Sequence, residues 1–159
     1  MKKLILSTLI VLLALPVWFF GGAIAVQAEE MTCPDHTAVT IDIKPDDRFN
    51  KINLSARGLL PVAVLTTDDF DASQFAPEMA HLSDAEIAMT MGCVGADAVR
   101  WKYADVNYDG RLDLVFFFRI RDLNLTSRST AATLMAHGTY GSTDIHILGT
   151  DSVRVKRWH

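Results

Sequence analysis

Most of this chain consists of short segments in which apolar and polar residues alternate, separated by turns rich in glycine, proline and aspartate. In residues 38–45, for example, Val39, Ile41 and Ile43 alternate with polar residues, and residues 114–120 form the most strongly β-prone segment. Such a period of two places successive side chains on opposite faces of a β-strand. Each half-apolar sheet must then cover its face with another. The pattern therefore predicts an all-β fold, an antiparallel two-sheet β-sandwich of about 7–9 strands that is Ig-like or jelly-roll-like.

The turn residues divide the chain into its expected elements. Residues 68–79 are expected to form a turn or a short helical segment that Pro77 closes, with Phe70 and Phe75 filling one end of the core. No segment after residue 28 shows a convincing amphipathic helical pattern. The expected strands lie in residues 38–45, 51–55, 59–67, two short stretches around Ser83 and Asp84, 98–106, 114–120, 130–138, 142–149 and 150–158.

The N-terminus carries an export signal. Lys2 and Lys3 precede a long apolar run, and Val26 and Ala28 have the spacing that a signal peptidase accepts. We therefore expect residues 1–28 to be a signal peptide, residues 29–159 to form a single domain, and the protein to be secreted or periplasmic. The alternative is an uncleaved membrane anchor, because 23 uncharged residues from Leu4 are long enough to span a bilayer.

Charge narrows the range of partners. Without residues 1–28 the chain has 13 basic and 19 acidic residues, a formal charge of −6. A net-acidic chain has no overall attraction for phosphate backbones, so nucleic acid is not expected as a partner. The one basic cluster along the sequence, Arg154–His159, is expected to be a solvated end.

Two cysteines, Cys33 and Cys93, follow the export signal. In an oxidising compartment they are expected to form a disulfide, which would close a loop of about 60 residues and stabilise the fold by about 4 kcal/mol. Two buried free thiols remain the alternative, because spacing alone does not show that the two Cβ atoms meet.

The stretch DVNYDGRLD, residues 105–113, is the strongest candidate site. Its oxygen-bearing residues and the glycine that permits a sharp bend match the first positions of a calcium loop. Phe116 occupies the twelfth position, where an EF-hand has glutamate, and a strand pattern follows instead of a helix, so an EF-hand is excluded. The predicted Ca²⁺ ligands are the side chains of Asp105, Asn107, Asp109 and Asp113 and the main-chain carbonyl of Arg111.

The alternative for this stretch is a polar hairpin, since Asn, Asp and Gly are common in turns. Three neighbouring aspartates repel one another unless a cation neutralises them, and this favours calcium. Aromatic residues near the loop could form a platform for a sugar ring, although such residues more often pack in a core. These residues are Trp101, Tyr103 and Tyr108.

Other catalytic patterns are weak. His137 and His146 lie on neighbouring expected strands, where cross-strand pairing could bring them together, but two separate half-exposed histidines are the simpler expectation. The sequence contains no Gly-x-Ser-x-Gly, glycine-rich phosphate loop or Cys-x-x-Cys. Its many acidic residues offer carboxylate pairs on paper, which indicate a glycosidase only if their geometry is suitable.

Three strings carry a family resemblance: VTIDIKPDDRFNKINLSARGLLPVAVLTTDDFDASQF, ADVNYDGRLDLVFFF and GTDSVRV. In this order, from about Val39 to Val155, they resemble the secreted β-sandwich module of bacteria and archaea with an IDIKPG opening and a DVNGDG loop. The resemblance implies a calcium loop and no catalytic activity of the module's own. Asp46 stands where the family has glycine, Tyr108 replaces a small residue in the loop, and residues 116–122 replace a strand that often carries a histidine.

Together these features predict an exported calcium-binding β-sandwich module with a non-catalytic binding or assembly role, and a protein or glycan partner. One alternative is a small secreted hydrolase or lyase that uses carboxylates near the calcium. Another is a carbohydrate-binding module. A membrane association is expected only if the signal segment stays uncleaved.

Overall fold

The computed structural model describes residues 35–91 and 94–156. The predicted signal peptide, Cys33, Cys93 and Trp158 lie outside the described residues, so the predicted cleavage and disulfide stay predictions. The elements are β1 (Thr37–Ala38), β2 (Ile41–Ile43), β3 (Lys51–Asn53), β4 (Leu59–Val64), η1 (Ala72–Gln74), β5 (Phe75–Asp84), α1 (Ala85–Met91), β6 (Ala96–Ala104), β7 (Asp113–Arg119), η2 (Ile120–Asp122), β8 (Ala131–Tyr140), β9 (Thr143–Ser152) and β10 (Arg154–Lys156).

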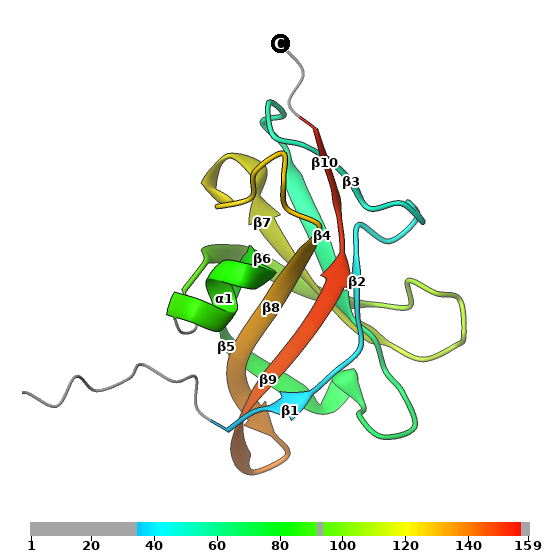
Figure 1. The fold of residues 1–159 in the computed structure, drawn as a ribbon. Coiled ribbons are helices and arrows are strands. Elements are labelled where there is room, and N and C mark those ends of the chain that lie inside the picture. The colour runs from blue at the N-terminus through cyan, green and yellow to red at the C-terminus, as the bar shows by residue number, and fades with distance from the viewer. Residues whose placement is uncertain (1–34, 92–93, 157–159) are drawn as a thin grey trace, which may run out of the picture.

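Eight strands form one strongly curled sheet in the order β1-β9-β8-β5-β6-β7-β4-β2 (Figure 1). Its two edge strands, β1 and β2, are consecutive in the chain, and only Val39 and Thr40 separate them. The Val39 amide donates to the Leu148 carbonyl of β9, while the Thr40 carbonyl accepts from the amide of Leu65, just after β4. Two neighbouring residues thus join opposite edges, because the sheet curls round until those edges meet.

The sheet has two halves that face each other. Strands β5 and β6 connect the halves through only two residue pairs, His81 with Asp97 and Leu82 with Ala96. One buried cluster contains side chains from both halves, among them Leu134 and Ile147 from one and Phe116 from the other. The predicted all-β, mainly antiparallel fold is therefore confirmed, but its two facing layers are halves of one curled sheet joined at a corner, and the second sheet has only β3 and β10.

Close packing where the edges meet requires a glycine. A Cβ atom built on Gly149 of β9 would lie 2.5 Å from the Ile41 Cγ2 atom and 2.8 Å from the Val39 carbonyl oxygen. Any larger residue would force β9 away from the segment that links β1 to β2. This position therefore helps to explain why the sheet curls as tightly as it does.

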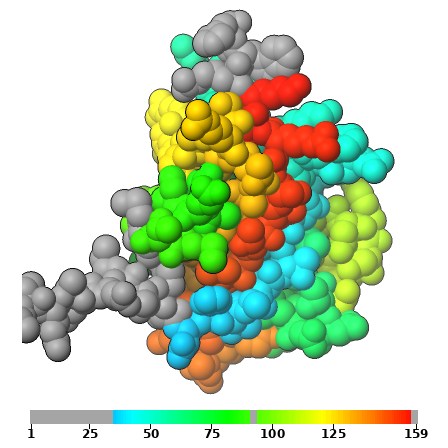
Figure 2. All heavy atoms as spheres, in the orientation of Figure 1, coloured from blue at the N-terminus to red at the C-terminus, as the bar shows by residue number. Residues whose placement is uncertain are grey.

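The remaining two strands, β3 and β10, form a small parallel sheet in which Lys51 pairs with Arg154 and Ile52 with Val155. Figure 2 shows the red C-terminal strand bordered by the cyan residues around β3. Ile52 and Val155 are buried, whereas Lys51 and Arg154 are exposed. A segment about a hundred residues away in the sequence thus contributes to the surface next to β3.

Two local predictions are wrong. Residues 85–91, expected as a short strand, form the helix α1 after β5 ends at Asp84. The Asp84 side chain accepts a hydrogen bond from the Glu86 amide, which satisfies a free donor at the start of the helix, and alanine, glutamate and methionine are good helix formers. Pro77 does not close a turn, because it lies inside β5 next to a bulge. Strands tolerate proline at such irregularities.

No helix within residues 35–91 and 94–156 is long and apolar enough to cross a membrane.

Candidate metal-binding loop

Residues 105–112 connect β6 to β7, which are antiparallel neighbours paired at Ala104 and Asp113. The loop therefore leaves and re-enters the sheet at the same place (Figure 1). Tyr108 has φ of 61° and Gly110 has φ of 86°, both in the left-handed region. These two residues reverse the chain sharply, and the Asp109 side chain between them accepts a hydrogen bond from the Arg111 amide of the loop's own backbone.

The side chains of Asp105, Asn107 and Asp109 converge. The Asp109 amide donates to both Asp105 Oδ1 at 3.2 Å and Asn107 Oδ1 at 3.1 Å, which places these two oxygens beside one nitrogen. The backbone amide of Gly110 donates to Asp105 Oδ2 at 2.9 Å. The side-chain Nδ2 of Asn107 donates to Asp109 Oδ2 at 3.0 Å. Alternate residues of the loop thus bring oxygen atoms together, as the sequence predicts.

Asp113 lies apart from this group. Its side chain is fully buried, and its two oxygens accept hydrogen bonds from the Thr66 amide at 2.8 Å and the Val106 amide at 3.0 Å. The Thr66 hydroxyl donates in turn to the Leu112 carbonyl at 2.6 Å. Asp113 therefore fastens both ends of the loop to the end of β4. Its predicted role as a calcium ligand stays a prediction.

Arg111 supplies a cation that the sequence argument did not include. Its guanidinium group contacts Asp109 Oδ2 at 3.1 Å and Asp68 Oδ1 at 3.1 Å. The backbone N–H of Arg111 donates to Asp109 and is the main cause that lowers the pKa of Asp109, with further contributions from Asn107 and the guanidinium group. The guanidinium group and the amides around Asp113 therefore offset part of the expected repulsion among the aspartates.

The donor set still fits a hard cation. Asp105 and Asp109 each have two carboxylate oxygens, and Asn107 and the Arg111 carbonyl add one each, which gives six oxygens if all are used. Calcium takes 6–8 oxygen ligands. Each Asp105 oxygen accepts one hydrogen bond and keeps a lone pair, whereas Asp109 Oδ2 already accepts three, from the Asn107 side chain and the Arg111 guanidinium group, which calcium would have to displace. Residues 35–91 and 94–156 contain no group of three or more His, Cys, Asp or Glu side chains placed to hold a metal, in agreement with the separation of Asp113.

The three predicted platform aromatics are exposed but have different surroundings. Trp101 is 45% exposed and Tyr103 41% exposed, two residues apart on β6, while Tyr108 at the loop tip is 84% exposed. The Tyr103 hydroxyl donates to the Phe75 carbonyl at 2.7 Å, so this ring bridges β6 to the start of β5. Of the three rings, that of Tyr103 is therefore held by a hydrogen bond to a neighbouring strand.

His137 and His146 are brought together, contrary to the simpler expectation. They are direct partners in the pairing of β8 with β9, and their ring centroids lie 4.6 Å apart. His137 Nδ1 also lies 3.4 Å from the Glu78 carboxylate. The register of the two strands produces this pair, which an alternation pattern alone does not fix.

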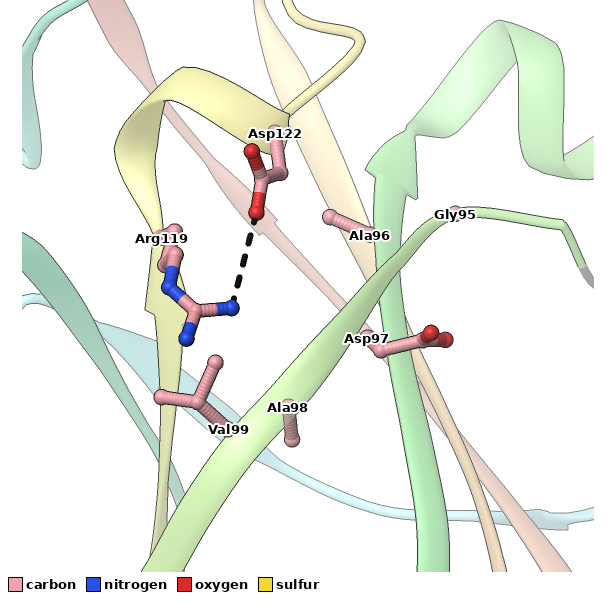
Figure 3. A pocket seen from close by; sticks show the side chains of 7 residues that line it. All are labelled: Gly95, Ala96, Asp97, Ala98, Val99, Arg119 and Asp122. Carbon is pink, nitrogen blue, oxygen red and sulfur yellow. Dashed lines mark ion pairs between the residues drawn. The ribbon is translucent and has the colours of Figure 1, made fainter.

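A hollow of about 530 Å³ lies where β6 leaves β5, and Figure 3 shows the seven residues that line it. Arg119 and Asp122 form an ion pair there at 3.9 Å, and the Asp97 carboxylate points away from them. Asp97 instead contacts His81 Nδ1 at 2.8 Å. The two acidic side chains thus have separate partners and do not form the facing pair that a carboxylate-based hydrolase needs.

A basic cluster that the sequence does not predict lies around β3 and β10, formed by Lys44, Arg48, Lys51, Arg154 and Lys156. The sequence predicts only a solvated basic tail that includes Arg154 and Lys156. The pairing of β10 with β3 places them beside residues from the opposite end of the described chain.

Comparisons with protein-family models, with curated proteins and with solved structures found no match to this chain.

Proposed function

We propose that the protein is an exported, calcium-binding β-sandwich module whose role is binding or assembly and not catalysis. Export is supported by the sequence of residues 1–28, and a relationship to the IDIKPG module is supported by the three strings that resemble it. The proposed calcium ligands are Asp105, Asn107, Asp109, the Arg111 carbonyl and Asp113, whose buried side chain also holds the loop in place.

The observation that carries this proposal is the convergence of Asp105 Oδ1 and Asn107 Oδ1 on the Asp109 amide. A plain hairpin turn requires only one side chain that accepts from the backbone two residues on. Here two alternate side chains direct oxygens to one place, and a second carboxylate, that of Asp109, contacts the Asn107 side chain beside them. Bound calcium would hold these side chains in one arrangement and reduce the repulsion between Asp105 and Asp109.

A carbohydrate-binding role is the second candidate, and the exposed aromatics of β6 favour it. Trp101 and Tyr103 follow each other at a spacing of two on one strand, and the Tyr103 hydroxyl is fixed by the Phe75 carbonyl. Exposed aromatic rings of fixed orientation are suited to stacking against sugar rings. Trp101→Ala should then lower affinity for a neutral glycan without changing the calcium response.

Melting experiments test the calcium proposal. A ligand that binds only the folded state stabilises it by RT ln(1 + [L]/Kd), about 2.7 kcal/mol at a hundred times Kd. Extracellular calcium modules have Kd of about 10⁻⁴–10⁻³ M, so the melting temperature should rise between EDTA and about 10 mM calcium. Magnesium should produce a smaller rise, because it requires a tighter octahedral shell.

Asp109→Ala should abolish the calcium response, because it removes a carboxylate from the centre of the loop. Asp68→Ala is the matched control: Asp68 also contacts Arg111 but contributes no oxygen to the loop, so this variant should keep the response. A melting temperature of the unmodified protein that is the same in EDTA and in calcium would contradict the proposal.

A further inference from the structure

A second surface of the molecule collects positive charge. A hollow of about 370 Å³ is lined by Lys44, Lys51, Ile52, Asn53 and Lys156, and we call these five residues the basic hollow. They come from the end of β2, from β3 and from β10. The hollow is thus formed by segments that are close in space but far apart in the sequence.

Buried polar contacts hold these segments together. The Asn50 side chain is buried and donates to Asp151 Oδ2 at 2.8 Å and to the Ser152 carbonyl at 2.8 Å. The Arg154 amide donates to the Asn50 carbonyl at 3.1 Å. Asp151 also accepts from the Ile43 amide at 3.0 Å. The end of β2 and the residue before β3 are therefore tied to the end of β9 and the start of β10.

Left-handed backbone shapes the turn that carries the lysines. Lys44, Asp46 and Asn50 have φ of 59°, 81° and 47°. A residue with a side chain adopts this region at a cost of about 1–2 kcal/mol unless its surroundings hold it there. The Lys44 amino group donates to the Lys51 carbonyl at 2.8 Å, and it also forms an ion pair with Asp47 at 2.9 Å. The direction of Lys44 is therefore set by the fold.

Cations surround an aromatic ring next to the hollow. The Arg48 and Arg154 guanidinium carbons lie 4.9 and 4.8 Å from the centre of the Phe49 ring, and the Lys51 amino nitrogen lies 5.0 Å from it. Each distance is within the range of a cation–π contact. These contacts hold three long side chains near one place, which reduces the conformational entropy that a bound ligand would have to remove.

The charge of this region is opposite to that of the chain as a whole. Lys44, Arg48, Lys51, Arg154 and Lys156 carry five positive charges, and the adjacent Asp46 and Asp47 carry two negative ones. The region therefore has a formal charge of +3, against −4 for the whole chain, so the rest of the chain carries −7. A local positive field on an acidic protein attracts anions to one place and repels them elsewhere.

We propose that the basic hollow and the adjacent Phe49 cluster bind the carboxylate or sulfate groups of an acidic glycan. This inference rests on the proposed binding role but not on calcium. Lysine amino groups act as compact charges with rotatable donors, which suits anionic groups presented at irregular spacing along a polymer. The hollow receives one such group, and Arg48 and Arg154 contact the next along the chain.

Two features favour a glycan over an anionic membrane. The lysines line a concave surface, whereas a bilayer presents a broad plane. Phe49, the aromatic residue at this site, has three cationic groups within 5.0 Å of its ring centre, so its ring is engaged by these cations and is not presented alone to a lipid interface.

Affinity chromatography and calorimetry with the purified full chain test the proposal, using alginate and heparin as acidic glycans and dextran as the neutral control. Lys51→Gln/Arg154→Gln should weaken binding to alginate or heparin roughly tenfold, since two exposed ionic contacts are lost. Arg100→Gln/Lys102→Gln is the matched control. It also removes one arginine and one lysine that lie over a phenylalanine ring, Phe117, on another face.

The proposal is supported if the unmodified protein and the Arg100/Lys102 variant bind acidic glycan at low salt and the Lys51/Arg154 variant binds much more weakly. Equal weakening of both variants would show attraction by net charge alone and overturn it. So would absence of binding by the unmodified protein to both acidic glycans. Binding to vesicles of phosphatidylcholine and phosphatidylserine without binding to glycan would overturn it in favour of a membrane.

Melting curves of both variants, measured in parallel, show whether each still folds. If the Lys51/Arg154 variant does not fold, Lys51→Gln alone provides the same test, because Lys51 is exposed. The calcium response is measured on the same samples. A protein that binds acidic glycan but ignores calcium would retain this inference while contradicting the calcium site.

Discussion

The aspartate loop and the basic hollow are built in opposite ways. In the loop, most side-chain hydrogen bonds link residues two to five positions apart, as in those from the Asp109 and Gly110 amides. At the hollow, the contacts of Asn50 and Ile43 with Asp151 and Ser152 span 101 to 108 positions. Both use left-handed backbone to turn the chain. The loop can therefore form largely on its own, whereas the hollow exists only in the completed fold.

Asp113, at the end of the loop, differs from the other loop residues because its partner Thr66 is 47 positions away. Removing its side chain should lower the free energy of unfolding more than the other substitutions do. Asp113→Ala leaves the Thr66 and Val106 amides without their acceptor and opens a small cavity. We expect a loss of about 3–4 kcal/mol in the free energy of unfolding. Asp109→Ala, measured without calcium, should cost less than about 1 kcal/mol because Asp109 is exposed. Urea denaturation measures both, and equal losses would show that the two aspartates do not differ in role.

The Asn50 side chain holds the segment before β3 to the end of β9, and its removal should have the next largest effect. Asn50→Ala removes its side-chain bonds to Asp151 and Ser152 and places alanine at φ of 47°, with an expected loss of about 2–3 kcal/mol. Asn50→Gly loses the same bonds without the backbone strain and should cost about 1 kcal/mol less. Both variants should also bind acidic glycan more weakly. Full glycan affinity in Asn50→Gly would show that the hollow does not depend on this anchor.

Substituting Gly110 tests whether the loop needs its left-handed backbone, and the expected loss of stability is smaller. A Cβ atom there meets no other atom within 4 Å, but φ is 86°, so Gly110→Ala should cost about 1 kcal/mol through backbone strain alone. Gly58 is the matched control, since its Cβ would also meet nothing and its φ is not left-handed. Gly58→Ala should change stability by less than about 0.5 kcal/mol. Equal thermal shifts for the two would show that the loop tolerates other conformations at position 110.

The pKa of Asp42 is affected by aspartates near both the hollow and the loop, and substituting Asp42 should change stability least. Burial raises the pKa of Asp42, and the negative charges of Asp151, Asp46 and Asp113 raise that pKa further. The folded state therefore binds a proton on Asp42 more readily than the unfolded state does. This contribution to stability is present at low pH and is lost as pH rises through the raised pKa.

Asp42→Asn should therefore raise the melting temperature slightly at neutral pH and leave it unchanged at a pH below the ordinary aspartate range. Melting curves across that pH range measure the difference. A variant equally stabilised at both pH values would point to a cause other than the charge on Asp42.

The alternation of apolar and polar residues, together with the turn residues, predicts strands well where the adjacent strands of the sheet pair regularly. The segment LVFFFRI becomes β7, and residues 130–138 and 142–149 become most of β8 and β9. The pattern wrongly predicts a strand at residues 85–91, which form a helix. Ala88 is buried there, and a buried alanine is equally consistent with a strand. The Asp84 side chain accepts a hydrogen bond from the Glu86 amide, and this N-cap favours a helix. The spacing of apolar residues does not reveal such a local polar contact.

Site residues were predictable only where the site is continuous in sequence. The convergence of Asp105, Asn107 and Asp109 follows from their alternate spacing and Gly110. The burial of Asp113 does not, because its partner Thr66 is 47 positions away. Likewise nothing in the order of residues places Lys51 beside Arg154, since that contact depends on a parallel pairing between distant strands.

The two parallel pairings determine when the fold can be completed. Strand β1 pairs with β9, and β3 with β10, so these two early strands find their partners only in the last ones, whereas β2 pairs with β4. Closing such long loops has an entropic cost before any contact offsets it, and chains dominated by distant pairings fold slowly. During synthesis, β3 must therefore remain without its partner until residue 156 has left the ribosome. A chain that stops just short of β10 should accumulate as a partly folded species with β3 exposed.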